Sequence, residues 1–185
     1  MKVKDISLMS IMLSILIITS KISIDLFIIS MTLQTFSVIL ISLILKWKRS
    51  FIVILVYVLM GLIGIPVFSN GGGFFYVLKP SFGFILGFLL STLIVGSKPF
   101  ENKKISYFIK AIIGLAIIDI IGLIYMSLIL NLYMDLSYSF IKILKIGLLP
   151  FVIKDIFSVT LASLVALRVN NEIYLKEVEA QRVTL

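Results

Sequence analysis

The fold class is decided by the run Ile105-Ser-Tyr-Phe-Ile-Lys-Ala-Ile-Ile-Gly-Leu-Ala-Ile-Ile-Asp-Ile-Ile-Gly-Leu-Ile-Tyr-Met-Ser-Leu-Ile-Leu-Asn-Leu132. Only two of its side chains, Lys110 and Asp119, carry a charge at neutral pH. A helix needs about 20 mostly apolar residues to cross the hydrocarbon core of a bilayer. The run therefore predicts a membrane-spanning helix.

The composition of the whole chain agrees with this prediction. Of 185 residues, 61% are hydrophobic and 14% are charged, whereas a soluble domain has about 45–50% and about 25% respectively. The mean hydropathy is +1.21. A compact soluble domain of this size could not bury so many apolar side chains, so we expect an all-α integral membrane protein.

Two residue types are missing from the chain, which contains no cysteine and no histidine. Disulfides, thiol nucleophiles and thiolate metal sites are therefore excluded, and the usual general base and commonest metal ligand are absent. We expect a protein that is not an enzyme and that has no resident cofactor or metal. The formal net charge of +8 indicates basic cytoplasmic loops rather than nucleic-acid binding.

Apolar runs bounded by charged residues, glycine or proline predict six transmembrane helices in one membrane domain, residues 1–185. We place the helices at approximately residues 6–24, 32–46, 50–66, 80–97, 105–132 and 143–169. Residues 67–79 are expected to form an outer, apolar, glycine-rich loop, and residues 170–185 a polar cytoplasmic tail.

The lysine and arginine residues of the loops predict the orientation. With six spans, most of them share one side with both termini: Lys2, Lys4, Lys46, Lys48, Arg49, Lys98, Lys103, Lys104, Arg168, Lys176 and Arg182. The other side holds only Lys21, Lys79, Lys142 and Lys145. Because cytoplasmic loops are enriched in cations, we expect a multi-pass protein with both termini in the cytoplasm.

The loop at residues 67–79 differs from an ordinary linker. It contains Gly71, Gly72 and Gly73, yet the aromatic residues Phe68 and Tyr76 lie beside them, and a flexible linker would lack such side chains. Two interpretations stay open: a packed surface loop, or a lid over an outward-facing pocket, since long apolar loops are often functional.

The charged residues inside predicted spans include Asp119, Lys154 and Asp155, and ionisable groups in such spans by default indicate function. Asp155 is expected to contact a ligand, with the alternative that it caps free amides at a helix start. Lys154 is expected to point elsewhere, because neighbouring helix positions diverge by about 100°. For Asp119 we favour a hydrogen bond to a serine or threonine of another helix over a ligand role.

Small residues four apart allow helices to approach closely. Ser10 and Ser14 share one face of the first span, where a contact with another membrane protein is plausible. Gly83 and Gly87 share a face of the fourth span, and for them we favour packing within the chain.

Three motifs occur in order along the chain: Thr32-Leu-Gln-Thr-Phe36, Gly61-Leu-Ile-Gly-Ile-Pro-Val-Phe68 and Gly147-Leu-Leu-Pro-Phe-Val-Ile-Lys-Asp155. Together they resemble BioY, the biotin-binding S-component of energy-coupling factor (ECF) transporters, over residues 6–169. The resemblance implies a six-helix S-component fold in the bacterial cell membrane. It also implies a vitamin pocket near the outer surface, capped by the first–second and third–fourth loops.

The resemblance further implies partners and a binding site. The partners are a membrane coupling subunit, docked on Ser10 and Ser14, and two cytoplasmic ATPases; the chain has no G-x-x-x-x-G-K-[ST] motif of its own. The expected ligand-binding residues are Gln34, Phe68, Asn70, Gly72, Tyr76, Asp155 and Ser158. Ser158 stands where the family has a lysine that helps to recognise biotin, and Lys79 in the loop is a candidate substitute for that cation.

The leading hypothesis is therefore a biotin-binding, substrate-capturing subunit of an ATP-driven vitamin importer. Because Ser158 replaces the family's lysine, an alternative is an S-component for dethiobiotin, lipoate or another vitamin. A stand-alone vitamin transporter and a membrane enzyme using Asp119 or Asp155 are less favoured. The chain shows no internal repeat, which secondary transporters often have, and no second carboxylate stands at a useful spacing beside either aspartate.

Overall fold

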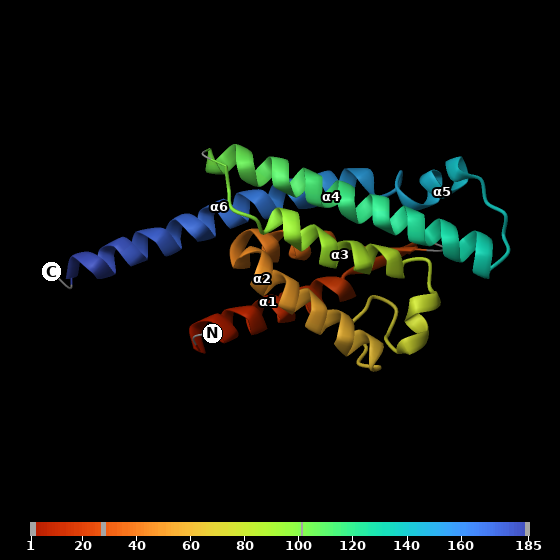
Figure 1. The fold of residues 1–185 in the computed structure, drawn as a ribbon, viewed down its shortest axis with the longest axis horizontal. Coiled ribbons are helices and arrows are strands. Elements are labelled where there is room, and N and C mark those ends of the chain that lie inside the picture. Colours follow the sequence, from red (N-terminus) through yellow and green to blue (C-terminus); the bar gives the residue numbers. More distant parts are fainter. Residues whose placement is uncertain (1–2, 27–28, 101, 184–185) are drawn as a thin grey trace.

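The fold is taken from a computed structural model that describes residues 3–26, 29–100 and 102–183. Six α-helices form there: α1 Val3–Lys21, α2 Gln34–Leu62, α3 Phe82–Val95, α4 Lys103–Leu128, α5 Phe140–Gly147 and α6 Val152–Val183. The shorter elements are the strands β1 Ser23–Leu26 and β2 Ile29–Thr32, the 3₁₀ helix η1 Phe74–Leu78 and the π-helical turn η2 Ile129–Tyr133. Both termini lie at one end of the elongated bundle, which we call the terminal end, and η1 and α5 lie toward the opposite end (Figure 1).

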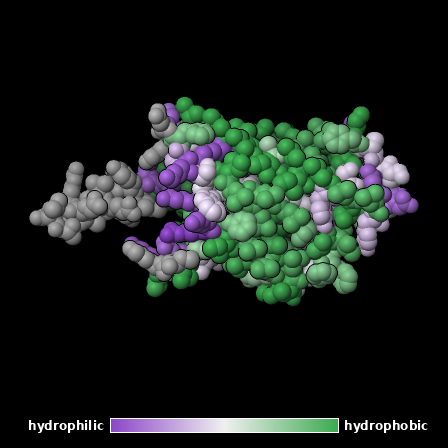
Figure 2. Space-filling view, viewed as in Figure 1, coloured by the Kyte–Doolittle hydropathy of each residue, from purple (hydrophilic) through white to green (hydrophobic). Residues whose placement is uncertain are grey.

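The surface of the bundle is that of a membrane protein. A broad apolar band covers the middle of the face shown in Figure 2, and hydrophilic residues gather toward its two ends. Large apolar side chains such as Ile18, Ile112 and Leu164 are exposed, which suits contact with lipid. By length and composition, α1 and the stretch Lys104–Tyr133 can each cross a membrane. The bent pair of Phe140–Gly147 and Val152–Asn171 could supply a third span, and the predicted six-helix, all-α membrane class is confirmed.

Helix α2 contains two of the expected spans, residues 32–46 and 50–66, joined at a kink. Lys46 adopts φ 63° and ψ 167° there, outside the helical range. The backbone N–H of Trp47 bonds the carbonyl of Gly96 at 2.9 Å instead of continuing the helix. A Cβ on Gly96 would lie 2.4 Å from that Trp47 nitrogen, so only glycine permits the contact.

The expected sixth span, residues 143–169, is also broken. Helix α5 ends at Gly147 and α6 begins at Val152, with a bend of 51° between them. Pro150 lies in the break, where it lacks the N–H that a continuous helix requires. The break places the first turn of α6, which includes Asp155, out of line with α5.

The first expected span, residues 6–24, ends earlier than its apolar character suggested. Helix α1 stops at Lys21, and β1 and β2 pair as an antiparallel hairpin with Ser23 opposite Thr32 and Ile24 opposite Met31. The two strands read Ser-Ile-Asp-Leu and Ile-Ser-Met-Thr, an alternation of polar and apolar residues with the period of a strand. The hairpin therefore replaces the plain loop expected between the first two helices.

Two glycines of α3 allow it to lie directly on α4. A Cβ on Gly83 would come within 2.3 Å of the Tyr125 Cβ, and one on Gly87 within 2.8 Å of the Ile118 Cα. Their packing within the chain, expected from their spacing of four, is confirmed. The contact at Ile118 also fixes the position of the next residue of α4, Asp119.

Candidate functional site

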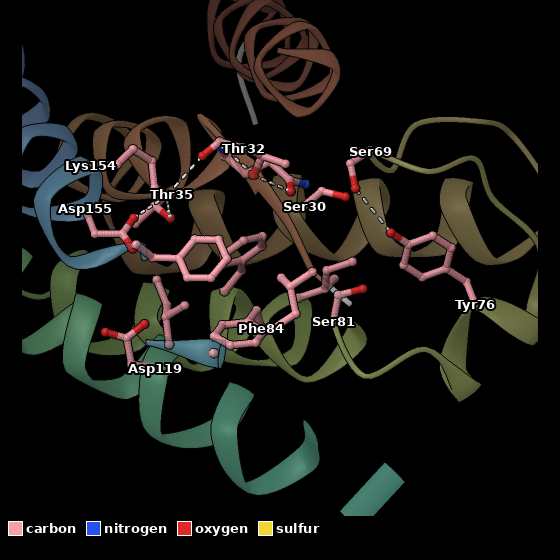
Figure 3. Close-up of a pocket in the computed structure, with 17 residues that line it drawn as sticks. Ser30, Thr32, Thr35, Ser69, Tyr76, Ser81, Phe84, Asp119, Lys154 and Asp155 are labelled. Carbon is pink, nitrogen blue, oxygen red and sulfur yellow. Dashed lines mark hydrogen bonds and ion pairs between the residues drawn. The ribbon is translucent and has the colours of Figure 1, made fainter. Parts of the chain in front are cut away.

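A cavity lies between the hairpin, the segment that joins α2 to α3, and helices α2, α3, α4 and α6 (Figure 3). The space between its lining atoms measures about 580 Å³, including the part open to solvent. Its walls are apolar and aromatic in the middle, formed by Phe84, Ile85, Phe88, Ile118 and Phe151.

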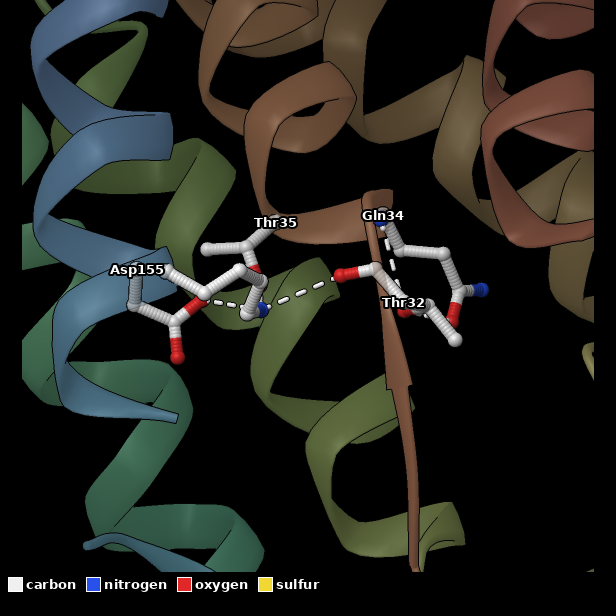
Figure 4. A network of polar contacts seen from close by, with 5 residues as sticks. Thr32, Gln34, Thr35 and Asp155 are labelled. Atoms are coloured by element: carbon white, nitrogen blue, oxygen red, sulfur yellow. Dashed lines mark hydrogen bonds and ion pairs between the residues drawn. The ribbon is translucent and has the colours of Figure 1, made fainter. Parts of the chain in front are cut away.

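One end of the cavity, which we call the charged end, is formed by Asp119, Lys154 and Asp155. Asp155 is only 5% exposed and forms an ion pair with Lys154. The Lys154 ammonium also donates to the backbone carbonyl of Thr32 at 3.1 Å and to the Thr35 hydroxyl at 3.4 Å (Figure 4). The charged end is thereby tied to the start of α2.

Gln34 connects this region to residues 63–81, the segment between α2 and α3, which we call the cap. Its side-chain oxygen accepts a hydrogen bond from the Thr32 hydroxyl at 2.9 Å, and its amide nitrogen donates to the Tyr57 hydroxyl at 2.6 Å. Tyr57 in turn donates to the Val67 carbonyl at 3.0 Å. One buried network therefore joins the hairpin, α2 and the segment that follows α2.

The opposite end of the cavity, which we call the hydroxyl end, is formed by Ser69, Tyr76 and Ser81. The Ser69 and Tyr76 hydroxyls lie 3.4 Å apart, as Figure 3 shows. Tyr76 also packs on Phe68, with ring centroids separated by 4.5 Å. The cavity is thus polar at both ends and apolar between them.

Three of the residues expected from the sequence line the cavity: Gln34, Tyr76 and Asp155. Three others support its cap. Phe68 is fully buried against Tyr57 and Tyr76; the exposed Asn70 donates to the Ser30 hydroxyl of the hairpin at 2.9 Å. Gly72 lies so close to the backbone that a Cβ would be 2.4 Å from the Ile65 carbonyl oxygen.

Ser158 lies one turn beyond Asp155 on α6 but is not among the cavity-lining residues. It is 1% exposed, and its hydroxyl has no hydrogen-bond partner among the described residues. Most serines and threonines of these helices instead bond a carbonyl of the preceding turn, as Ser163 bonds Val159 at 2.8 Å. Ser158 is therefore a small, buried polar residue whose hydroxyl does not bond the preceding turn of its own helix.

The expectation that Lys154 points away from Asp155 was wrong. Their Cα–Cβ bonds do diverge on the helix, but the four-carbon stem of Lys154 lets the ammonium return to the Asp155 carboxylate. Lys79, the candidate substitute cation, is instead directed to the cap, since it donates to the Asn70 carbonyl at 3.2 Å and lies 4.6 Å from the Tyr76 ring centroid.

The expectation for Asp119 was also wrong. Among the described residues, none donates the serine or threonine hydrogen bond that we had favoured, and Asp119 lines the cavity instead. Ser30, Thr32 and Thr35 also line the cavity, from the hairpin and the start of α2, and were not among the expected ligand-binding residues. The strand-like alternation of residues 23–26 and 29–32 was the signal that could have found the first two.

Ser10 and Ser14 lie on an exposed face of α1, away from the cavity. Their hydroxyls donate to the Ile6 and Ser10 carbonyls, each at 3.0 Å. Both hydroxyl groups are thus satisfied within the helix. In the described part of the chain, no group of three or more acidic residues is placed to hold a metal ion.

Known proteins with similar sequences are transporters. The model of the BioY family matches residues 1–174. A probable biotin transporter BioY of Pyrococcus horikoshii is 32% identical over 169 residues, covering 91% of this chain and 97% of that protein. The biotin transporter BioY of Thermotoga maritima is 30% identical over 170 residues, covering 91% and 94%.

A solved structure with a similar fold is the crystal structure of the S-component for biotin from an ECF-type ABC transporter. It matches with a TM-score of 0.77 at 22% identity, covering 91% of this chain and 92% of that chain. The expected S-component fold is thereby confirmed.

Proposed function

This chain belongs to the BioY family, and we propose that it is the biotin-binding, substrate-capturing S-component of an ATP-driven ECF vitamin importer. The relatives that cover most of the chain carry the name of biotin transporters. The observation that carries the proposal is the cavity itself, with a buried carboxylate at one end, hydroxyls at the other and an aromatic wall between them.

The shape and polarity of the cavity suit biotin. Biotin has a cyclic urea fused to a thioether ring, and an acid chain leads away from the rings. Because the carboxylates of the charged end accept hydrogen bonds, the urea N–H groups belong there, against Asp155. The rings then pack on Phe84, Phe88 and Phe151, and the acid group reaches the hydroxyl end at Ser69, Tyr76 and Ser81.

The remaining residues of the proposed site act around the ligand. Gln34 and Tyr76 contribute hydrogen bonds from the walls, while Phe68, Asn70 and Gly72 hold the cap that closes over the cargo. Ser158 leaves room behind Asp155 where the family has a lysine. In this chain the ion pair of Asp155 is formed with Lys154, whose other donors are directed to Thr32 and Thr35.

The transport step requires partners that supply energy. We place a membrane coupling subunit on the exposed face of α1 at Ser10 and Ser14, with two cytoplasmic ATPases beyond it. The basic residues at the terminal end, including Lys48, Arg49 and Lys98, support a multi-pass orientation with both termini in the cytoplasm. This arrangement assigns capture, and no catalysis, to the chain.

Direct binding of labelled biotin to the purified protein tests the proposal. We expect saturable binding that unlabelled biotin displaces completely. Competition with dethiobiotin and lipoate tests the alternative cargoes, since dethiobiotin keeps the urea whereas lipoate has none. Tighter binding of lipoate than of biotin would overturn the biotin assignment, and uptake that persists without the coupling ATPases would favour a stand-alone transporter.

A further inference from the structure

Asp119 is a cavity-lining carboxylate that the family resemblance does not assign. It lies on α4, which packs against α6, and it lies at the same end of the cavity as Asp155 in Figure 3. None of the described residues hydrogen-bonds its carboxylate, and it remains partly exposed to the cavity. A partly buried carboxylate in a largely apolar wall needs a hydrogen-bond partner or water.

Lys154 is not available to be that partner. A lysine ammonium has three N–H donors, and those of Lys154 are directed to the Thr32 carbonyl, the Thr35 hydroxyl and the Asp155 carboxylate. The charged end therefore combines two carboxylates with one ammonium that is already saturated. The charged groups at this end therefore offer a ligand hydrogen-bond acceptors but no free donor.

We propose that Asp119 is a second ligand-binding carboxylate, which accepts a hydrogen bond from one ureido N–H of the cargo while Asp155 accepts from the other. The inference rests on the proposed function, because it assumes a cargo with a cyclic urea. Two N–H groups of one rigid ring match two carboxylates supplied by two different helices. Asp119 then selects for cargoes with N–H donors and against a carboxylate at the same end.

The wild-type protein provides a first test that needs no substitution. Biotin analogues methylated on one or the other ureido nitrogen each lose one N–H and gain a bulky group. If both N–H groups are bound, each analogue binds at least about tenfold more weakly than biotin, since each has lost one hydrogen bond to a charged group. Binding of either analogue as tightly as biotin would overturn the proposal.

The second test uses 2-iminobiotin, in which a positively charged guanidinium replaces the urea. Its affinity relative to biotin should fall by about tenfold or more in Asp119→Asn, which removes a negative charge while keeping the size of the side chain. Asp119→Glu keeps the charge and should keep the wild-type ratio of the two affinities. Asp135→Asn is the matched control, because Asp135 is an exposed loop carboxylate with φ 53°, a conformation that asparagine tolerates.

The outcomes separate this inference from the proposed function. If the wild type binds biotin but Asp119→Asn leaves the ratio of affinities unchanged, Asp119 does not contact the cargo and the function stands. If the wild type binds no biotin, the proposed function fails and the assignment of Asp119 fails with it. A fall in the ratio confined to Asp119→Asn, with both methylated analogues rejected, establishes the second carboxylate.

Discussion

Helices are interrupted at both ends of the bundle, but the interruption is filled by protein at one end and lines a cavity at the other. At the terminal end, the kink at Lys46 frees the Leu43 carbonyl and the Trp47 amide, and both find partners within the protein. The side chain of Asn170 donates to the Leu43 carbonyl at 3.3 Å and to the Tyr107 hydroxyl at 2.8 Å, while Trp47 bonds Gly96. The terminal end is closed by these contacts.

At the other end, the break around Pro150, the hairpin and the segment between α2 and α3 surround open space. Polar groups face the cavity there, from Ser69 and Tyr76 at one end to Asp155 at the other. Irregular backbone is tolerated in a membrane protein where protein buries it or where it lines a cavity. The comparison suggests that substitutions at the cavity change affinity, whereas those at the terminal end change only stability.

The largest effect is expected from Asp155→Ala. It leaves the ammonium of Lys154 buried without its counter-ion, and removing one partner of a buried pair costs about 3–5 kcal/mol. We expect labelled biotin to bind more than about 100-fold more weakly in an equilibrium binding assay. The double variant Lys154→Met with Asp155→Leu should recover thermal stability without recovering binding, and wild-type affinity in Asp155→Ala would contradict the assignment.

Phe68→Ala tests whether the cap is held by packing. The Phe68 ring is fully buried, contacts Tyr57 edge-on and Tyr76 at a tilt, and covers Gly61, where a Cβ would lie 2.0 Å from the ring. The loss of such a ring costs about 3–5 kcal/mol of unfolding free energy, which thermal unfolding in detergent would measure. Phe68→Leu retains most of the volume and should lose clearly less; equal losses would argue against a packed cap.

Gly96→Ala tests the closed end. The new Cβ would meet the Trp47 backbone at 2.4 Å, and overpacking of this kind costs about 1–3 kcal/mol. We expect a lower melting temperature with biotin affinity within about twofold of wild type. A large loss of affinity would show that the two ends are coupled and would break the comparison.

Asn170→Ala removes the side chain that satisfies the freed Leu43 carbonyl. The expected loss is about 1 kcal/mol of stability, the usual contribution of a hydrogen bond. Thermal unfolding would measure it, and a parallel biotin titration should show no change. Tyr107→Phe removes only the second of the two contacts and should cost less than Asn170→Ala.

The smallest effect is expected from Ser158→Ala. Because the Ser158 hydroxyl is buried without a partner among the described residues, its removal should be neutral or slightly stabilising, within about 0.5 kcal/mol. Biotin affinity should also stay close to wild type if Lys154 alone serves Asp155. A marked loss of affinity would instead place the Ser158 hydroxyl against the cargo.

Local sequence patterns predicted where most of the helices lie but not where the chain breaks, bends or pairs as strands. Apolar length predicted the spans that became α1, α3 and α4, and glycine spacing predicted the packing of Gly83 and Gly87. The hairpin was missed because its short strands lie between apolar runs that resemble helix ends. The position of Asp119 was misjudged because its α4 neighbours are apolar on all sides, so the local sequence does not show which side of the helix faces the cavity.

By itself, the sequence determined that this chain is a helical membrane protein, which end carries the basic loops, and that Asp119, Lys154 and Asp155 lie among apolar residues. These properties depend on composition and on the pattern of apolar and charged residues within single helices. Only the tertiary structure decided that Lys154 folds back onto Asp155, that both aspartates line one cavity and that Ser158 is buried outside its lining. The direction and partners of a side chain depend on helices packed against it from distant parts of the chain, and a local pattern contains no record of them.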